Sequence, residues 1–358
     1  MESFNDFMQL KLNERISSSS KRQLPLTEKL IDFSSNDYLG IANERITGST
    51  GSRLISGNSN EVNALEYFFS ELVNAESALF FPSGYQANVG LIPSISDRNT
   101  TILYDEYIHA SLRDGIQLSH AKSFSYKHND LIHLNQRLEK IEGLKLIITE
   151  SVFSMDGDSP DLEKLLELAK KYDAGVVIDE AHSFGISGNE GKGMVNSLGI
   201  QKEILAVVYP MGKAVGTSGA FITGNQLLRD YLINFCRSFI YSTAPSKTLV
   251  KEVHEQLKLI TASYNKTSIH LLKDYFVKHL SKSYHLITGE NSAIISIKIP
   301  GNENVKKIEN ELMKAGIFAK SIMHPTVPKG EERLRICFHD FNSKDDVDLL
   351  VGQLNQFQ

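Results

Sequence analysis

Short apolar runs alternate along the chain with segments that carry apolar residues at helical spacing. Val62, Leu65 and Phe69, for example, form one face of a helix that begins near Glu61. The apolar runs lie at 78–81, 101–104, 121–126, 144–149, 174–179, 204–208 and 219–223. They are unbroken, as is typical of strands buried on both faces. The pattern predicts an α/β fold, with a mainly parallel central sheet covered by helices on both faces.

The pattern changes after about residue 245. A long helical region reaches about residue 275, and the tail then predicts strands at 293–299, 317–321 and 333–338 around a helix at 304–315. This order is typical of a smaller C-terminal α+β domain. We therefore expect three parts: an N-terminal helix (2–16) and linker within 1–47, which includes a short strand at 30–34, a large domain at 48–245, and a connecting helix with the small domain at 246–358.

The composition favours small-molecule chemistry. The 358 residues carry a net charge of −5, which leaves no basic excess for nucleic acid. Cys236 and Cys337, the two cysteines, provide neither a disulfide framework nor a CxxC metal site. The chain starts without a signal-peptide pattern and has no run of 18 apolar residues, so we expect a cytoplasmic protein without a membrane anchor.

One lysine lies in a glycine-rich loop between two apolar runs, in the stretch Glu203–Gly224. Such a loop restricts the amine of Lys213, and a buried or crowded amine loses its proton more easily than a free one. It can then form a Schiff base with an aldehyde. The alternative is a surface lysine in an ordinary turn.

Further polar residues follow the ends of other predicted strands. Ligands collect at the carboxyl ends of parallel strands, where Ser83, His109, Ser154, Asp179 and Lys213 are all expected. The run at 78–81 passes through Ser83 directly into a helix. Free N–H groups and the positive end of the helix dipole would make this turn an anion site. The convergence predicts a single ligand site.

Pyridoxal phosphate needs the three features that meet there. Its phosphate needs the helix start, its aldehyde needs Lys213, and its pyridine nitrogen stays protonated beside a buried carboxylate such as Asp179. His109 could stack on the ring, and His182 could approach the phenolic oxygen. Each residue also has an ordinary alternative: Asp179 could cap a helix, His109 could be a core histidine, and Asp179 with His182 could be half of a metal site. No third ligand shares that spacing, and no phosphate-loop motif occurs.

Ten motifs in order resemble one known family. They are NDYLG (36–40), GSRLISG (51–57), FPSGYQAN (81–88), Asp105 with HAS (109–111), KHND (127–130), TESVFSMDGD (149–158), DEAHSFG (179–185), GKAVG (212–216), YST (241–243) and RLRICF (333–338). Over nearly its full length the chain is similar to the α-oxoamine synthases, of fold type I among pyridoxal-phosphate enzymes. The resemblance implies a fold-type-I transferase and a homodimer with shared active sites.

The resemblance also implies roles for individual residues. Lys213 would be the Schiff-base lysine, Asp179 the partner of the pyridinium nitrogen and His109 the ring-stacking residue. His182 and Ser154 would lie near the phenolic oxygen.

The remaining roles concern the phosphate and the substrate. The resemblance implies that Ser83, Gly84 and Tyr85 bind the phosphate at the helix start. Thr243 would reach the phosphate of the neighbouring subunit's cofactor.

Arg335 would hold the amino-acid carboxylate by a bidentate pair, in preference to Arg333. Asn36, in the first motif, is also expected to contact the substrate. The implied reaction joins L-alanine to an acyl thioester, pimeloyl on coenzyme A or on a carrier protein, with loss of carbon dioxide, and gives a biotin precursor. Two alternatives stay open: a family member that uses glycine or serine with another acyl group, and a non-catalytic paralogue.

Two features depart from the family pattern. Pro210 stands three residues before Lys213, where the family usually has a threonine that contacts phosphate. Proline offers neither a hydroxyl nor an N–H, so cofactor affinity is expected to be lower unless other hydroxyls substitute. The segment between Gly40 and Gly51 is also shorter than in the family, which could alter the substrate entrance.

Overall fold

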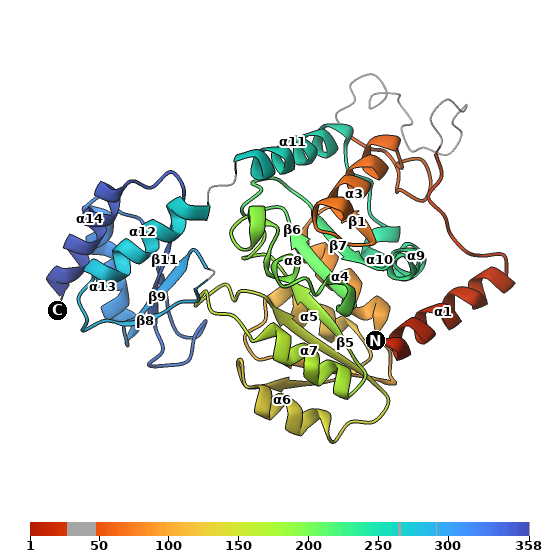
Figure 1. Ribbon diagram of the computed structural model, residues 1–358, viewed down its shortest axis with the longest axis horizontal. Coiled ribbons are helices and arrows are strands. Elements are labelled where there is room, and N and C mark those ends of the chain that lie inside the picture. Colours follow the sequence, from red (N-terminus) through yellow and green to blue (C-terminus); the bar gives the residue numbers. More distant parts are fainter. Residues whose placement is uncertain (27–47, 264–265, 291, 358) are drawn as a thin grey trace.

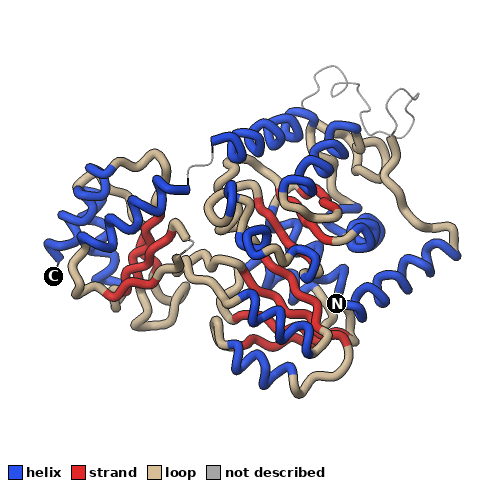
Figure 2. The backbone as a smooth tube through the Cα atoms, in the orientation of Figure 1, coloured by secondary structure: helices blue, strands red, loops and turns tan. Residues whose placement is uncertain are grey.

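The computed structural model describes residues 1–26, 48–263, 266–290 and 292–357, and its two β-sheets lie in two separate parts of the molecule (Figures 1 and 2). The predicted strand at 30–34, Asn36 and most of the Gly40–Gly51 segment lie outside the described residues.

The large sheet has seven strands in the order β1-β7-β6-β5-β4-β2-β3. The strands are β1 (Ser77–Phe81), β2 (Thr100–Asp105), β3 (Lys122–Tyr126), β4 (Leu144–Glu150), β5 (Ala174–Asp179), β6 (Ala206–Pro210) and β7 (Ala220–Gly224). Every neighbouring pair from β6 to β3 is parallel, whereas β7 runs antiparallel to both β6 and β1. The predicted α/β fold with a mainly parallel sheet is therefore confirmed.

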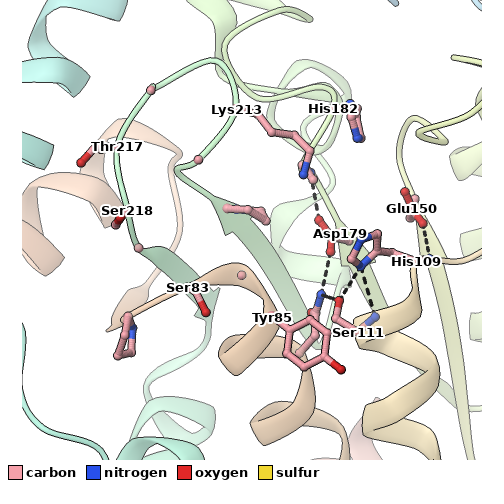
Figure 3. Close-up of a pocket in the computed structure, with 18 of the residues that line it drawn as sticks. Ser83, Tyr85, His109, Ser111, Glu150, Asp179, His182, Lys213, Thr217 and Ser218 are labelled. Atoms are coloured by element: carbon pink, nitrogen blue, oxygen red, sulfur yellow. Dashed lines mark hydrogen bonds between the residues drawn. The ribbon is translucent and has the colours of Figure 1, made fainter. Parts of the chain in front are cut away.

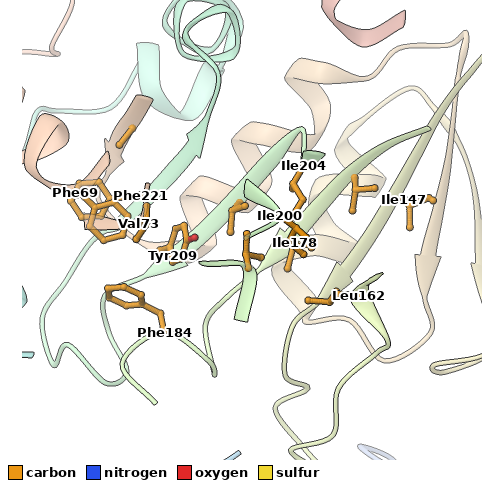
Figure 4. Packing of buried hydrophobic residues seen from close by; sticks show 14 of the residues in the cluster. Phe69, Val73, Ile147, Leu162, Ile178, Phe184, Ile200, Ile204, Tyr209 and Phe221 are labelled. Carbon is orange, nitrogen blue, oxygen red and sulfur yellow. The ribbon is translucent and has the colours of Figure 1, made fainter. Parts of the chain in front are cut away.

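Helices cover both faces of this sheet (Figure 1). The helices of this part are α1 (Glu2–Ser17), α3 (Asn60–Leu72), α4 (Gly84–Ile95), α5 (Ala110–Leu118), α6 (Leu131–Leu138), α7 (Leu162–Lys171), α8 (Met194–Leu198), α9 (Gln226–Phe235), α10 (Arg237–Ile240) and α11 (Lys247–Ser263). On one face Phe69 stacks on Phe221 with ring centroids 3.9 Å apart, and Tyr209 meets Phe69 edge to face (Figure 4). Two buried clusters thus hold the strand ends rigidly in place.

The smaller part is a four-stranded antiparallel sheet, ordered β10-β11-β9-β8, with helices packed beside it. Its elements are α12 (Lys266–His279), β8 (His285–Ile287), β9 (Ile294–Lys298), α13 (Asn302–Lys314), β10 (Lys320–Ile322), β11 (Arg333–Cys337) and α14 (Lys344–Leu354). The predicted smaller α+β unit is present, although its boundary at 246 stays a prediction, as does the boundary at 47.

Several predicted element boundaries were wrong. The sequence predicts a helix at 160–171, but α7 begins at Leu162, because the Asp161 carboxylate caps it by accepting a hydrogen bond from the Lys164 N–H at 3.1 Å. The strand predicted at 317–321 begins at Lys320 instead, because the Ile317 N–H closes the end of α13 by donating to the Leu312 carbonyl. Strand β6 extends past its predicted end to Pro210, which pairs with Ala220 of β7.

Strand β3 is largely exposed rather than buried, because within the described part of the chain it lies at the edge of the sheet and pairs with β2. The pattern also missed β8, which has three residues, and α14, which begins with a capping box between Ser343 and Asp346. Among the helices of the described ranges, none is both long and apolar enough to cross a membrane.

Candidate active site

A cavity of about 580 Å³ opens at the carboxyl ends of the large sheet's strands (Figure 3). The predicted site residues that line it are Ser83, Gly84, Tyr85, His109, Asp179, His182 and Lys213. They come from the ends of β1, β2, β5 and β6 and from the start of α4. The fold therefore brings together residues spread over 130 positions of the sequence, as the carboxyl-end argument predicts.

Three other predicted residues do not line this cavity. Ser154 lies in the segment after β4, and its carbonyl accepts a hydrogen bond from Arg335 Nε at 2.6 Å. Thr243 lies in a different hollow, which it shares with Gly51 and Tyr241. Arg335 belongs to β11 of the small sheet, although it is near enough to act electrostatically on His182.

The predicted anion site is the start of α4, which lines the cavity. Ser83 caps this helix, and its hydroxyl accepts a hydrogen bond from the Gln86 N–H at 3.2 Å. The first N–H groups of an α-helix have no partner within the helix, and Gly84 and Tyr85, which carry two of them, line the cavity at the positive end of the helix dipole. A Cβ at Gly84 would lie 2.8 Å from the Pro210 ring, so this close approach requires glycine.

Replacing Pro210 by threonine is expected to tighten binding of pyridoxal phosphate by about 10-fold, because one hydrogen bond to a charged group contributes roughly 1.5–3 kcal/mol. The equilibrium dissociation constant of pyridoxal phosphate from the protein, measured after the cofactor has been removed and added back, reports this gain in affinity directly. Pro210→Val is the control, since it restores a backbone N–H without a hydroxyl. Equal affinity gains in both variants would contradict a role for the hydroxyl.

Lys213 lies in the loop between β6 and β7, as predicted. The residue is exposed to the cavity, because the glycines at 212 and 216 leave the loop without covering side chains. Its amine is near enough to act on both Asp179 and His182 (Figure 3). Position within a cavity of charged groups, rather than burial, therefore defines its chemistry.

Asp179 ends β5 and is 3% exposed. Its Oδ2 accepts a hydrogen bond from Asn88 Nδ2 at 2.8 Å, and its Oδ1 accepts one from the Ala181 N–H at 2.9 Å. Burial raises the pKa of Asp179, while the hydrogen bond from Asn88 and the charge of Lys213 lower it. These partners stabilise the carboxylate, as a pyridinium partner requires.

A second carboxyl group, Glu150, lies opposite Asp179 on the neighbouring strand. Burial and the charge of Asp179 raise the pKa of Glu150 well above its ordinary value. Its Oε1 accepts a hydrogen bond from the His109 N–H at 2.6 Å. Two adjacent buried carboxyls compete for one negative charge, and the more strongly raised pKa of Glu150 favours the proton on Glu150 and the charge on Asp179.

A hydrogen-bonded chain connects Asp179 to the ring of His109. Asn88 Nδ2 also donates to Ser111 Oγ at 3.0 Å, and that hydroxyl lies 2.8 Å from His109 Nδ1 (Figure 3). Because the Ser111 N–H donates to the same Nδ1 at 3.1 Å, Nδ1 is the acceptor and the neutral ring carries its proton on Nε2. The chain fixes the orientation of the imidazole that opens to the cavity.

Sequence reasoning missed Asn88, Ser111 and Glu150. Each one stands inside a motif that was used only for the resemblance: FPSGYQAN, HAS and TESVFSMDGD. Asn88 also lies one helical turn after Gly84, which places it on the cavity side of α4. That spacing was a usable signal.

Burial and the charges of Lys213 and Arg335 lower the pKa of His182 to about 3. The folded protein therefore keeps this ring neutral, whereas the unfolded chain binds a proton below about pH 6.5. The contribution of His182 to the free energy of unfolding is therefore complete above pH 6.5 and is lost as the pH falls toward 3.

Between pH 7 and pH 5, the free energy of unfolding of the parent should fall by up to about 2 kcal/mol more than that of His182→Asn. Urea unfolding at both pH values measures this difference, with the exposed His285→Asn as control. An unchanged pH dependence in His182→Asn would show that the ring titrates normally.

The two arginines of β11 differ in availability. Arg333 is buried and paired with Asp156, so its charge is already neutralised. Within the described part of the chain, the guanidinium of Arg335 makes one hydrogen bond, from Nε to the Ser154 carbonyl. This leaves the end of Arg335 available for an anionic group.

The fold and the cavity define a transferase of the pyridoxal-phosphate class. The aminotransferase class I and II family matches residues 28–352, and the chain belongs to this family. The chain is 36% identical over 346 residues to 8-amino-7-oxononanoate synthase of Lysinibacillus sphaericus, covering 92% of this chain and 89% of that protein. It is 35% identical over 349 residues to 8-amino-7-oxononanoate synthase 2 of Bacillus subtilis, covering 91% and 89%.

Solved structures agree with these relatives. The 8-amino-7-oxononanoate synthase of Francisella tularensis superposes with a TM-score of 0.76 at 30% identity, over 90% of this chain and 92% of that chain. The serine palmitoyltransferase of Sphingomonas wittichii superposes with a TM-score of 0.82 at 27% identity, over 88% and 80%. The predicted family and fold type are thereby confirmed.

The residues that line the cavity fit pyridoxal phosphate. It combines a helix start, a lysine amine and a buried carboxylate, each positioned for a different part of the cofactor. The buried Asn88 Oδ1 has no hydrogen-bond partner among the described residues. An unsatisfied polar atom in a cavity wall indicates that a polar ligand belongs there.

Proposed function

We propose that this protein condenses L-alanine with a pimeloyl thioester, with loss of carbon dioxide, to give 8-amino-7-oxononanoate for biotin synthesis. The observation that carries the proposal is the meeting of Lys213, Asp179, His109 and the α4 start in one cavity. The names of the relatives supply the choice of substrates. Bound pyridoxal phosphate supplies an electron sink for the carbanion formed at the α-carbon.

The residues of the chain then have separate tasks. Lys213 holds the cofactor through its amine and, once displaced by the substrate, accepts the α-proton at Nζ. Asp179 keeps the ring nitrogen protonated, and His109 packs on the ring face. The neutral His182 lies beside the phenolic oxygen, and Gly84 and its neighbours in the helix start hold the phosphate.

The amino-acid carboxylate is assigned to Arg335. Its planar guanidinium can form two parallel hydrogen bonds with a carboxylate, and its Nε is already fixed by the Ser154 carbonyl. Arg333 is less suited to bind this carboxylate, because it already forms an ion pair with Asp156. Ser154 acts here through its backbone, and its predicted place near the phenolic oxygen stays a prediction, as does the substrate contact of Asn36.

A second candidate is an oxoamine synthase that uses serine or glycine and a longer acyl group. The similarity to Sphingomonas wittichii serine palmitoyltransferase, with its TM-score of 0.82, favours this candidate. Product masses from a panel of amino acids and acyl-coenzyme A compounds separate the two functions.

The test of the proposal is the absorption of the purified protein between about 300 and 550 nm, before and after L-alanine and pimeloyl-coenzyme A. We expect a visible band that borohydride removes and L-alanine shifts, together with the mass of 8-amino-7-oxononanoate in the product. Cofactor binding without that product would refute the substrates. A protein that stays colourless with added pyridoxal phosphate would instead be a non-catalytic paralogue.

We further propose that two copies form a homodimer in the cytoplasm and complete each other's sites. The hollow beside Thr243 carries the exposed side chains of Ile55 and Tyr241, as a subunit contact would. A monomeric mass in sedimentation equilibrium with the cofactor bound would refute the shared site.

A further inference from the structure

One motif of the sequence, KHND at 127–130, has no task in the proposed function. In the structure, His128 lies between two carboxylates. Its Nδ1 is 2.9 Å from Asp105 Oδ1 and its Nε2 is 2.7 Å from Asp158 Oδ2. The ring is stacked on Tyr107 at 4.4 Å and meets the edge of Phe153 at 4.5 Å.

The geometry requires a charged imidazolium. An ionised carboxylate only accepts hydrogen bonds, so each ring nitrogen facing one must carry a proton. Burial opposes this charge, but the hydrogen bonds and charges of Asp105 and Asp158 raise the pKa of His128 to about 10. The bridge is therefore intact throughout the neutral pH range.

One end of the bridge holds the segment 153–158. The Asp158 carbonyl accepts from the Phe153 N–H at 2.9 Å, which closes the segment into a turn. Its members then contact the small sheet one after another: the carbonyls of Ser154, Met155 and Gly157 accept from Arg335, Ser296 and Gly289, and Asp156 pairs with Arg333. The turn 153–158 therefore positions Arg335, the residue assigned to the amino-acid carboxylate.

The other end of the bridge holds the segment that leads to His109. Asp105 is fully buried at the end of β2, and its carboxylate also accepts from the N–H groups of Tyr107 and Asn129 at 2.9 and 2.8 Å. The segment then turns, with the Ile108 N–H donating to the Asp105 carbonyl, and reaches His109. His128 thus connects the segment that leads to His109 with the turn 153–158 that contacts Arg335.

We infer that His128 is a positioning residue, which sets the distance between Arg335 and the cofactor cavity by bridging Asp105 and Asp158. The inference rests on the proposed function, because it assumes that Arg335 binds the amino-acid carboxylate. His128 touches neither the cavity nor the substrate, so its effect passes through the turn 153–158. Loss of the bridge should weaken the amino-acid subsite and leave the phosphate subsite at α4 unchanged.

The experiment uses the full, cofactor-loaded protein with His128→Phe, which keeps the stacked ring and removes both hydrogen bonds. We expect about a 10-fold or larger rise in the dissociation constant for L-alanine, the loss typical of a charge-assisted hydrogen bond. The dissociation constant for pyridoxal phosphate should change less than about 3-fold. Amide exchange should become faster at 153–158. His133→Gln is the matched control: His133 lies in the adjacent helix α6, makes hydrogen bonds with the Lys127 N–H and with Arg137, and hydrogen-bonds neither carboxylate.

A second variant keeps the test decisive if His128→Phe does not fold. Asp158→Asn removes one end of the bridge, and His128→Gln is a smaller change at its centre. If both act by breaking the bridge, their effects on the dissociation constant for L-alanine should not add in the double variant. Equal losses for cofactor, L-alanine and thermal stability would show a merely structural role and overturn the inference. Unchanged exchange at 153–158 in His128→Phe or Asp158→Asn would also overturn it. The exchange measurement needs no catalysis, so it decides the inference even if the parent protein makes no condensation product.

Discussion

Replacing Lys213 by alanine should lower kcat for condensation by about 10³-fold or more. The variant loses both the covalent attachment of the cofactor and the base that accepts the α-proton, and positioned proton transfer alone contributes roughly 10²–10⁴-fold. Steady-state kinetics with excess pyridoxal phosphate measures the loss. In the parent, borohydride reduction followed by peptide mass analysis should place the cofactor on residue 213.

The chain contains a matched control in its other glycine-lysine pair. Lys192 follows Gly191 and is paired with Glu190 at 2.8 Å, away from the cavity. Lys192→Ala should retain the activity of the parent. Sustained multiple turnovers by Lys213→Ala would refute its assignment as the base.

Asp179→Asn should lower kcat roughly 10²–10³-fold while cofactor still binds. The amide has almost the same shape, and its oxygen can keep the hydrogen bond from the Ala181 N–H. It cannot stabilise a protonated ring nitrogen, and loss of such electrostatic stabilisation typically costs that much. Activity per bound cofactor, rather than total activity, is the quantity to measure. Cofactor content follows from absorbance after release in alkali.

Glu150→Gln separates charge from packing at the same place. Glu150 lies beside Asp179 but holds a proton, so an uncharged amide replaces an uncharged acid and its Oε1 still accepts from the His109 N–H. We expect a loss of less than about 10-fold, the size of one neutral hydrogen bond. If Glu150→Gln is as damaging as Asp179→Asn, the assignment of the negative charge to Asp179 is wrong.

The sequence was sufficient to predict the centre of the site. Lys213, Asp179, His109 and Ser83 each follow a buried strand, and parallel strands end at the same edge of a sheet, so local patterns alone bring these residues together. The same reasoning gave the order of strands and helices in the large part. It could not give the environment of Lys213, because exposure depends on how the glycine loop lies over the cavity.

Contacts between distant segments were beyond local patterns. The place of Arg335 depends on how the small sheet rests on the turn 153–158, and Asn88 acts through partners 23 and 91 positions away. The reversed direction of β7 was likewise not predicted, since an antiparallel strand buried on both faces has the same apolar pattern as a parallel one. Pairing direction is decided by tertiary contacts rather than by composition.

The pairing of β1 with β7 also bears on how the protein is made. Among the strands of the described residues, β1 lies at the edge of the sheet and pairs with β7, so Ser77 meets Gly224 across 147 positions of the chain. A ribosome adds roughly 5–20 residues per second, so β1 waits on the order of ten seconds before its partner emerges. The helix start to which we assign the phosphate follows β1 directly. Capture of the cofactor is therefore a late event in synthesis, after most of the large sheet has left the ribosome.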